Sequence, residues 1–305
     1  MKVLTNRRLA RTLIILCVGA LIGLVLFGFT GPYFAAGDSI AILRPQAGVL
    51  LGVFAILFLF LRARIYALIA TGFATLAVGS IAMGFTTPAP DCNGSCLMLY
   101  QKNLLSKAWP RYSLADDIIN SGAEIVTLQE VSDHNREYMA NMYAHYPAKI
   151  ICPFRPHQDV AVLTSLPVVE GSEFCLPGHG LAGLQVIPAD GEPIWALSVH
   201  LKWPFPFEQS AQSREVADRI AELDGPVLIG GDFNMVPWGA SVRRIGLAAG
   251  NEVFGAVENT HSLGGRALPL PIDNLLFPKG TTGTVELRPY LGSDHLGKLA
   301  RFQLP

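Results

Sequence analysis

Three long apolar segments near the start of the chain place the strongest constraint on its fold. They cover residues 9–29, 47–61 and 65–85. The first and third are long enough to cross a hydrocarbon core of about 30 Å as helices. The second is shorter and follows Arg44 and Pro45, but we interpret it as a third span. The alternative for the first segment, a cleaved signal peptide, is disfavoured because two further apolar segments follow and no clear small-residue cleavage site does.

The positions of the basic residues predict the orientation of this anchor, residues 1–85. Cytoplasmic segments beside membrane spans carry an excess of Lys and Arg. Most of the early basic residues lie at the N-terminus and in the turn between the second and third segments: Lys2, Arg7, Arg8, Arg11, Arg62 and Arg64. Both places should be cytoplasmic, which leaves residues 86–305 outside the cytoplasm. We therefore expect a multi-pass protein of the cell inner membrane with a periplasmic C-terminal domain, attached through a linker at 86–96.

Net charge divides the chain at the same place. Of the 23 Lys and Arg and 24 Asp and Glu residues, seven basic and one acidic residue precede position 85. Residues 85–305 therefore hold 16 basic and 23 acidic residues, a net charge of −7. Proteins that bind duplex nucleic acid gain much of their affinity by neutralising phosphates with Lys and Arg. We therefore expect no stable duplex nucleic-acid partner.

The cysteines agree with an oxidising compartment. Cys92, Cys96, Cys152 and Cys175 all fall in the segment expected outside, and Cys17 lies in the first apolar segment. An even number of cysteines outside is compatible with disulfides, and four cysteines allow three connectivities. Pairing of Cys92 with Cys96 would leave Cys152 with Cys175. The alternative is a cytoplasmic domain with four free thiols. Zinc binding is disfavoured because no His lies at ligand spacing from Cys92 and Cys96.

The C-terminal domain, residues 97–305, alternates short apolar runs with a few helical stretches. Many strands with few helices between them predict an α/β (α+β) fold in which two packed sheets are flanked by helices. Ser113 is the expected N-cap of the first helix, and Ser132 or Asp133 should start the second. The expected helices are 113–121, 132–146 and 208–223, and the expected strands are 97–103, 124–129, 160–164, 167–174, 184–188, 194–200, 226–229, 274–277, 284–288 and 299–303.

Polar residues gather at the ends of these apolar strands. A rigid strand fixes a side chain while the adjoining loop leaves room for a ligand, so functional residues concentrate there. Asp232 and Asn234 could instead form a simple Asx turn, and Asp294 with His295 could be a capping pair. We nevertheless interpret the set as one site. Its members are Asn103, Glu130, His200, Asp232, Asn234, Asp273, Asp294 and His295.

These residue types suit phosphodiester hydrolysis. The negative charge of a phosphodiester repels a nucleophile, so the reaction needs a hard cation, a base for water and donors for the phosphoryl oxygens. Glu130 and Asp294 can supply carboxylates to Mg²⁺, with Mn²⁺ as a substitute. His295 can act as the base if a carboxylate such as Asp273 holds its other ring nitrogen.

The order of these motifs resembles the endonuclease/exonuclease/phosphatase superfamily, the DNase I-like proteins. The resemblance covers residues 97–305 and rests on these motifs: Lys102-Asn103, Leu128-Gln129-Glu130, the run 159–165, Val199-His200-Leu201, Gly231-Asp232-Phe233-Asn234, Ile272-Asp273 and Ser293-Asp294-His295. It implies a four-layer α/β/β/α sandwich with two central sheets.

The resemblance also implies a role for each site residue. Glu130 would bind the metal, with Asn103 and Asp294 assisting. His295, paired with Asp273, would activate water. The remaining roles concern the substrate: Asp232 and Asn234 would position the nucleophile and the scissile phosphate, and His200 would bind or protonate a phosphoryl oxygen.

Two features depart from the family pattern. No Tyr matches the site tyrosine of abasic-site endonucleases, and the chain offers Phe154-Arg155 there instead. Asp273 is followed by Asn274, where a His or Tyr is commoner. Both departures disfavour a DNA-repair role.

The aromatic run 203–207 directly follows the His200 motif. We expect it either to pack as a rigid loop or to form a substrate-facing or bilayer-facing rim, with Trp203 contacting the substrate. The other histidines are expected to be surface or loop residues: His134, His145, His157, His179 and His261.

The sequence therefore predicts a membrane-tethered, Mg²⁺-dependent phosphodiesterase that acts outside the cytoplasm on a lipid or nucleotide phosphoester. An extracytoplasmic nuclease acting on DNA is the first alternative. The second is a catalytically silent binding module on the same fold. A transporter is disfavoured because the three spans hold no central charged residue.

Overall fold

A computed structural model of the protein describes residues 2–82, 92, 94, 96–107, 112–189, 191–263 and 268–305. The chain divides into two compact units. The first consists of Met1–Phe85 with the short segments Pro204–Pro206 and Trp238–Ala240, and the second holds the remaining residues up to Pro305. Of the predicted linker, only Cys92, Gly94 and Cys96 are among the described residues.

The N-terminal unit is built from apolar helices. They are α1 (Lys2–Phe27), α2 (Ala35–Ala41), α3 (Arg44–Phe60) and α4 (Arg64–Ala82). Small and aliphatic side chains from α1, α3 and α4, among them Val25, Leu51 and Ala70, pack against one another. Large apolar side chains on the same helices face outward, including Phe60 and Leu68, which are 82% and 78% exposed. Helices whose outer faces are also apolar are suited to a hydrocarbon environment.

Length and hydropathy identify which helices could span a membrane. Leu9–Phe27 and Arg64–Ala82 each have 19 residues and are apolar enough to cross one. Helix α3 does not meet the length test by itself. Joined with α2 across a bend of 59°, it would give a third, broken span. The third predicted span therefore stays a prediction, and Pro45 in the first turn of α3 stands at the bend.

The C-terminal unit is a sandwich of two mixed sheets. The first has the order β13-β14-β1-β2-β4-β3 and the second β5-β6-β7-β8-β12-β9. Their strands are β1 (Leu97–Asn103), β2 (Ile125–Val131), β3 (Ala148–Cys152), β4 (Asp159–Thr164), β5 (Phe174–Leu176), β6 (Leu181–Val186), β7 (Ile194–His200), β8 (Val227–Asp232), β9 (Asn251–Val253), β12 (Asp273–Pro278), β13 (Thr282–Arg288) and β14 (Gly297–Gln303).

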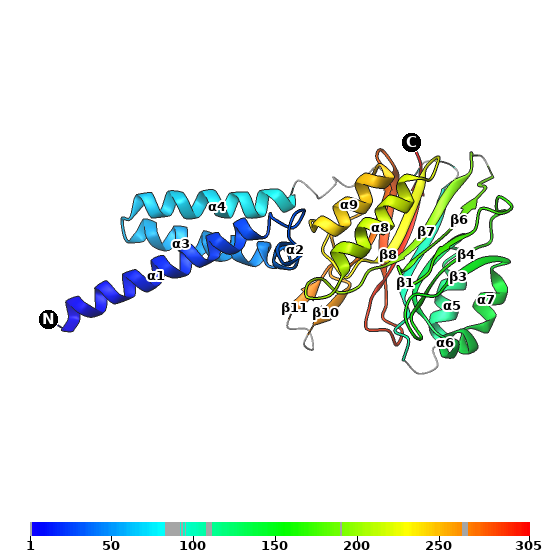
Figure 1. Cartoon of the computed structure of the whole chain (residues 1–305), viewed down its shortest axis with the longest axis horizontal. Helices are drawn as coiled ribbons and strands as arrows, with labels where there is room; N and C mark the ends of the chain where they lie inside the picture. Colours follow the sequence, from blue (N-terminus) through cyan, green and yellow to red (C-terminus); the bar gives the residue numbers. More distant parts are fainter. Residues whose placement is uncertain are drawn as a thin grey trace. The chain divides into compact units, whose positions relative to one another are not determined.

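Helices cover both outer faces of the sandwich, which confirms the predicted fold class (Figure 1). Leu114 and Ile118 of α5 (Tyr112–Asn120) pack on the first sheet together with α6 (Asp133–Tyr138) and α7 (Ala140–His145). Helices α8 (Gln209–Ala221) and α9 (Ala240–Ala249) cover the second sheet. The core between the sheets is aliphatic and aromatic and includes Leu184 and Phe277. The layers are therefore α/β/β/α.

Two parallel strand pairs set the position of the site. In the first sheet β1 pairs with β2 in the register that puts Asn103 opposite Gln129. In the second sheet β7 pairs with β8, and His200 lies opposite Asp232. Strand β1 also faces β8, and β2 faces β7, across the sandwich. The carboxyl ends of four strands therefore meet at one edge, where ligand sites of such sheets form.

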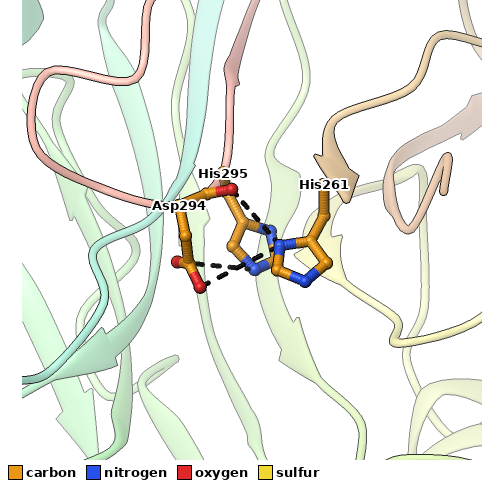
Figure 2. Close-up of side chains that lie close together, drawn as sticks. All are labelled: His261, Asp294 and His295. Carbon is orange, nitrogen blue, oxygen red and sulfur yellow. Dashed lines mark hydrogen bonds and ion pairs between the residues drawn. The ribbon is translucent and has the colours of Figure 1, made fainter. Parts of the chain in front are cut away.

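A short hairpin lies beside this edge. Strand β10 (His261–Leu263) pairs with β11 (Leu268–Leu270) in antiparallel fashion. The backbone N–H of Thr260, just before β10, donates to Leu270, and the carbonyl oxygen of Thr260 accepts a hydrogen bond from Leu296. This anchoring brings the imidazole of His261 next to His295 (Figure 2).

Two disulfides join the four cysteines of the C-terminal unit. Cys92 pairs with Cys96, and Cys152 pairs with Cys175. The second links β3, at the edge of one sheet, to β5, at the edge of the other. It therefore ties the two sheets together where no backbone hydrogen bonds do.

Several predicted elements need correction. Ser113 lies inside α5 and is not its N-cap, because the helix already includes Tyr112. The helix expected at 132–146 is two helices, broken at Met139; Ser132 does cap the first through a capping box with Asn135. The strand expected at 167–174 is wrong: an isolated bridge between Val168 and Val186 forms there, and strand β5 begins only at Phe174.

Candidate active site

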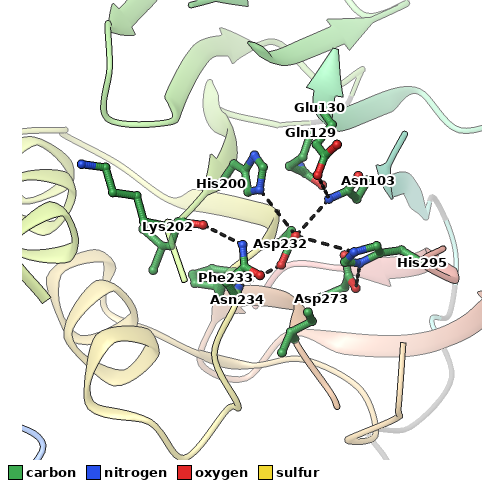
Figure 3. A network of polar contacts seen from close by, with 12 residues as sticks. Asn103, Gln129, Glu130, His200, Lys202, Asp232, Phe233, Asn234, Asp273 and His295 are labelled. Carbon is green, nitrogen blue, oxygen red and sulfur yellow. Dashed lines mark hydrogen bonds and ion pairs between the residues drawn. The ribbon is translucent and has the colours of Figure 1, made fainter. Parts of the chain in front are cut away.

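A buried carboxylate at the end of β8 is the centre of the site. Asp232 is 1% exposed, and its Oδ2 accepts a hydrogen bond of 2.9 Å from Asn103 Nδ2. Its Oδ1 accepts one of 2.9 Å from the backbone N–H of Asn234. The Nε2 atoms of His200 and His295 lie 3.6 Å and 3.9 Å from Oδ2 (Figure 3). Burial, opposed by the His295 charge, raises the pKa of Asp232 to about 7.

His295 and Asp273 form a buried pair beside this carboxylate. Nδ1 of His295 lies 2.8 Å from Oδ2 of Asp273, and the other oxygen of Asp273 accepts a 2.9 Å hydrogen bond from Gln101 Nε2. Burial alone would lower the pKa of His295, but the carboxylates of Asp273 and Asp232 raise it to about 10. The pKa of Asp273 is lowered, because its interaction with His295 outweighs its burial. The pair therefore carries the charges of an imidazolium and a carboxylate at neutral pH.

Glu130 occupies a bulge in β2. The pairing of β2 with β4 shifts between Leu128 and Val131, and Glu130 has φ = 56°, which few non-glycine residues adopt. Its Oε2 accepts a 2.9 Å hydrogen bond from the backbone N–H of Ser106, and Oε1 lies 3.4 Å from Asn103 Nδ2. Burial raises the pKa of Glu130, yet His200 and the Ser106 N–H together lower it overall. An ionised carboxylate beside an amide is thus presented at this edge.

His200 is enclosed between the sheets. Its Nδ1 is buried and has no hydrogen-bond partner among the described residues. The Phe154 ring stands edge-on to it at 5.1 Å between centroids, and Arg155 lies 5.0 Å from that ring. Burial lowers the pKa of His200 to about 4, so its imidazole is neutral. The pair Phe154-Arg155, noted above as a departure from the family pattern, is therefore part of the wall of the site.

The side chains of Asn234 and Asn274 donate hydrogen bonds to nearby backbone carbonyl oxygens. Asn234 has φ = 47° and donates from Nδ2 to the carbonyl oxygen of Leu201 at 2.8 Å. Asn is one of the few residues that adopt this backbone conformation readily. Asn274 donates to the carbonyl oxygens of Ile272 and Met235. These contacts hold the two segments that carry Asp232 and Asp273.

Asp294 and Trp203, the remaining residues expected in the site, lie at its rim. The Asp294 carboxylate is 49% exposed, and its Oδ1 lies 3.9 Å from Nε2 of His295. The ring of Trp203 lies 6.3 Å from that of His261. His261, expected at the surface or in a loop, is in fact only 9% exposed and stacks on His295 with 4.4 Å between ring centroids. The surface expectation for His261 was wrong.

Sequence reasoning missed Gln101 and Ser198, which support the site together with Gln129. Gln101 Nε2 donates to Gln129 Oε1 at 2.8 Å, and Gln129 Nε2 donates to Ser198 Oγ at 2.9 Å. Gln101 precedes Asn103 by two positions in one strand, so both side chains point to the same face. That spacing is the signal that could have identified Gln101.

Groups of carboxylates and imidazoles here could hold a metal ion. One consists of Asp232, Asp273 and His295, and the other of His261, Asp294 and His295. Glu130 offers carboxylate oxygens nearby. Asn103 has its Nδ2 toward Glu130 and Asp232, and its Oδ1 accepts the N–H of Leu105 at 2.9 Å. Hard divalent cations prefer such oxygen ligands.

Comparisons with known proteins agree on the fold. A humanized D. rerio TDP2 with 14 mutations is 20% identical, with a TM-score of 0.55 over 69% of this chain and 100% of that one. An endonuclease/exonuclease/phosphatase from Bacteroides vulgatus is 14% identical, with a TM-score of 0.58 over 70% and 100%. The human Nocturnin catalytic domain with bound sulfate is 16% identical, with a TM-score of 0.52 over 69% and 95%. No curated protein matches the chain.

At these identities the likeness to solved structures shows the fold alone. The sequence itself matches the family model over residues 101–295, which is more than half of its length. That match contains every residue of the site described above. The chain therefore belongs to the Endonuclease/Exonuclease/phosphatase family.

Proposed function

We propose that this protein is a metal-dependent hydrolase of phosphodiester bonds. One observation carries the proposal: the Asp232 carboxylate is buried with a raised pKa and stands between neutral His200 and charged His295. Such a set offers a proton acceptor and two groups for phosphoryl oxygens in one place. Members of this family are generally hydrolytic phosphoesterases or nucleases.

The residues present fit a hard divalent cation. Glu130 keeps a lowered pKa and is therefore ionised, and Asn103 beside it adds an amide. We propose that these two hold Mg²⁺, or Mn²⁺ in its place, with the half-exposed Asp294 assisting. When bound, the cation supplies positive charge to the phosphoryl oxygens.

The charge states of Asp232 and His295 favour a different general base from the one expected from the sequence. Sequence reasoning makes His295 the base. In the structure its ring lies between two carboxylates, so it already holds a proton at neutral pH. We propose that Asp232 takes the proton from water and that the His295 imidazolium faces the phosphoryl oxygen. Asn234 and His200 position these groups, and Asp273 holds the His295 ring.

The pH profile of hydrolysis distinguishes the two assignments. Asp232 can accept a proton only after losing its own, so the rate should rise through about pH 7. His295 loses its proton only near pH 10, so the rate should fall there. If neutral His295 were the base, the rate would instead rise towards pH 10. A bell-shaped profile of kcat/KM supports Asp232 as the base, and a single rise at high pH contradicts it.

The substrate class rests on charge and on the rim. The net charge of −7 in residues 85–305 disfavours duplex DNA. Trp203 lies near His261, at the rim of the site, and we propose that it contacts a lipid or nucleotide phosphodiester. Exposed Phe205 and Phe207 extend the aromatic run.

A substrate panel tests the function. The full chain, purified in detergent, is assayed with Mg²⁺ or Mn²⁺ on phospholipids, nucleotide diesters and plasmid DNA, with a Trp203→Ala variant beside it. We expect hydrolysis of a lipid or small diester that EDTA abolishes and a higher KM in the variant. Preference for plasmid DNA would identify an extracytoplasmic nuclease. Specific binding of a diester without turnover, with or without metal, would indicate a silent binding module.

We also propose that the N-terminal helices hold the protein in the inner membrane with the catalytic unit outside. The two apolar helices and the two disulfides support this placement. Protease added to intact spheroplasts should then degrade residues 97–305. Protection of that fragment until the membrane is broken would place it in the cytoplasm.

A further inference from the structure

His261 is held firmly against the proposed catalytic histidine. Its neighbour Thr260 is fixed by hydrogen bonds to three segments: its N–H donates to Leu270, its carbonyl accepts from Leu296, and its hydroxyl accepts from the N–H of Asp273. The hairpin that carries His261 is therefore tied to the strand of Asp273 and to the loop of His295. These bonds fix the backbone that carries the His261 imidazole.

Three donor groups converge at this place. Nδ1 of His261 lies 3.2 Å from the carbonyl oxygen of Asp294 and 4.0 Å from its Oδ2. Nε2 of His295 lies 3.9 Å from Oδ1 of the same carboxylate. One ligand atom from each of the three residues lies within 4.8 Å of the others (Figure 2). Asp294 is half-exposed, so an ion can reach the cluster from solvent.

The spacing is close to what a small cation requires. Ligand atoms at about 2.1 Å from a tetrahedral zinc are about 3.4 Å from one another. The distance from His261 Nδ1 to Asp294 Oδ2 is 4.0 Å and that from His295 Nε2 to Asp294 Oδ1 is 3.9 Å. Both must close by about half an ångström, and the half-exposed Asp294 carboxylate must turn one oxygen toward both nitrogens. The two rings are inclined at 29°, so the His261 ring must also tilt out of its stack. Its proton must lie on Nε2 to leave Nδ1 free for the cation, and the Nε2 proton of the His295 imidazolium must pass to water.

The donor chemistry selects the ion. Mg²⁺ prefers oxygen ligands, whereas two imidazoles and one carboxylate suit Zn²⁺, leaving the fourth position for water. We propose that His261, Asp294 and His295 form a second cation site, specific for Zn²⁺ or a metal of that class, beside the oxygen-rich site of Glu130 and Asn103.

Occupancy of this site has a consequence for the reaction, which rests on the function proposed above. Nδ1 of His295 is bonded to Asp273, so Nε2 is its remaining nitrogen. Nε2 also faces Asp232, and a cation bound to Nε2 prevents that nitrogen from carrying a proton. Zn²⁺ should therefore inhibit Mg²⁺-supported hydrolysis.

The experiment measures zinc binding directly on the full chain in detergent, with Mg²⁺ in excess to fill the oxygen-rich site. The test variant is His261→Phe, which keeps an aromatic ring against His295 but removes both nitrogens. The matched control is His179→Phe, because His179 also faces a carboxylate, that of Glu215, and belongs to neither of the two candidate metal groups. Asp294→Asn removes the third ligand.

We expect one tight Zn²⁺ site by calorimetry in the parent protein and in His179→Phe. Loss of a group that only supports a ligand costs about 10–100-fold in affinity, so loss of a ligand should cost at least about 100-fold. X-ray absorption should report two imidazoles on the zinc in the parent and fewer in His261→Phe. Equal zinc affinity in the parent and in both His261→Phe and Asp294→Asn would overturn the proposal.

The two proposals can fail separately. Calorimetry and absorption need no substrate, so the zinc site can be shown in a protein that hydrolyses nothing. If hydrolysis is found, the zinc concentration for half inhibition is measured in each protein relative to its own zinc-free rate. In His261→Phe this concentration should rise at least as many fold as the zinc dissociation constant does. Inhibition that is unchanged in this variant would remove the proposed link to His295.

Discussion

Replacing Asp232 with asparagine is expected to slow hydrolysis by about 10²–10⁴-fold, the usual contribution of a general acid or base. Asparagine has nearly the same size, and its oxygen can still accept the hydrogen bond from the Asn234 N–H. It cannot accept the water proton, and the His295 imidazolium loses one of its three carboxylate neighbours. The kcat of the full chain on the best diester of the panel measures the loss, and extra Mg²⁺ should not restore it.

A matched control separates this effect from general damage. Asp218→Asn makes the same chemical change on the exposed side of α8 and should keep the parent rate. In Asp232→Asn the new side-chain NH₂ faces Asn103 Nδ2, so two hydrogen-bond donors meet where a donor met an acceptor. A melting curve must therefore accompany the assay to show that the variant is folded. A folded Asp232→Asn protein that keeps the parent kcat would remove Asp232 from the reaction.

The arrangement of this site follows largely from features that can be read in the sequence. Asn103, His200 and Asp232 each end an apolar run, and the parallel pairing of their strands brings such ends to one edge. The pairing of His295 with Asp273 could also be anticipated, because the second ring nitrogen of a functional imidazole is often held by a carboxylate. What could be predicted is thus the set of groups that the strands carry.

The parts that could not be predicted depend on tertiary contacts. His261 belongs to a strand of three residues, which is too short to show a period. The hydrogen bonds of Thr260 and the contact of His261 Nδ1 with the Asp294 carbonyl place it against His295. The break at Met139 leaves no mark in the apolar pattern of 132–146, since Met139 and Met142 are both buried. The charge state of His295 depends on two carboxylates from different strands, which no local pattern reveals.

Glu130→Gln is expected to act through the metal and not through proton transfer. Removing a ligand should raise the Mg²⁺ concentration for half-maximal rate by at least about 100-fold, more than the 10–100-fold loss typical of groups that only support a ligand. Unlike Asp232→Asn, this variant should regain much of its rate in excess Mg²⁺. A titration of rate against Mg²⁺ distinguishes the two.

The bulge at Glu130 makes the control variant important. The Glu130 carboxylate accepts hydrogen bonds from Ser106 and Asn103, and glutamine offers only one oxygen for both. An unsatisfied donor there would cost about 1–3 kcal/mol of stability. Glu124→Gln is the matched change, since Glu124 sits just before the same strand and accepts the N–H of Met98 at 3.1 Å. It should leave the Mg²⁺ requirement as it is. If Glu130→Gln loses rate while its Mg²⁺ midpoint stays that of the parent, the carboxylate acts on the substrate and the cation is held elsewhere.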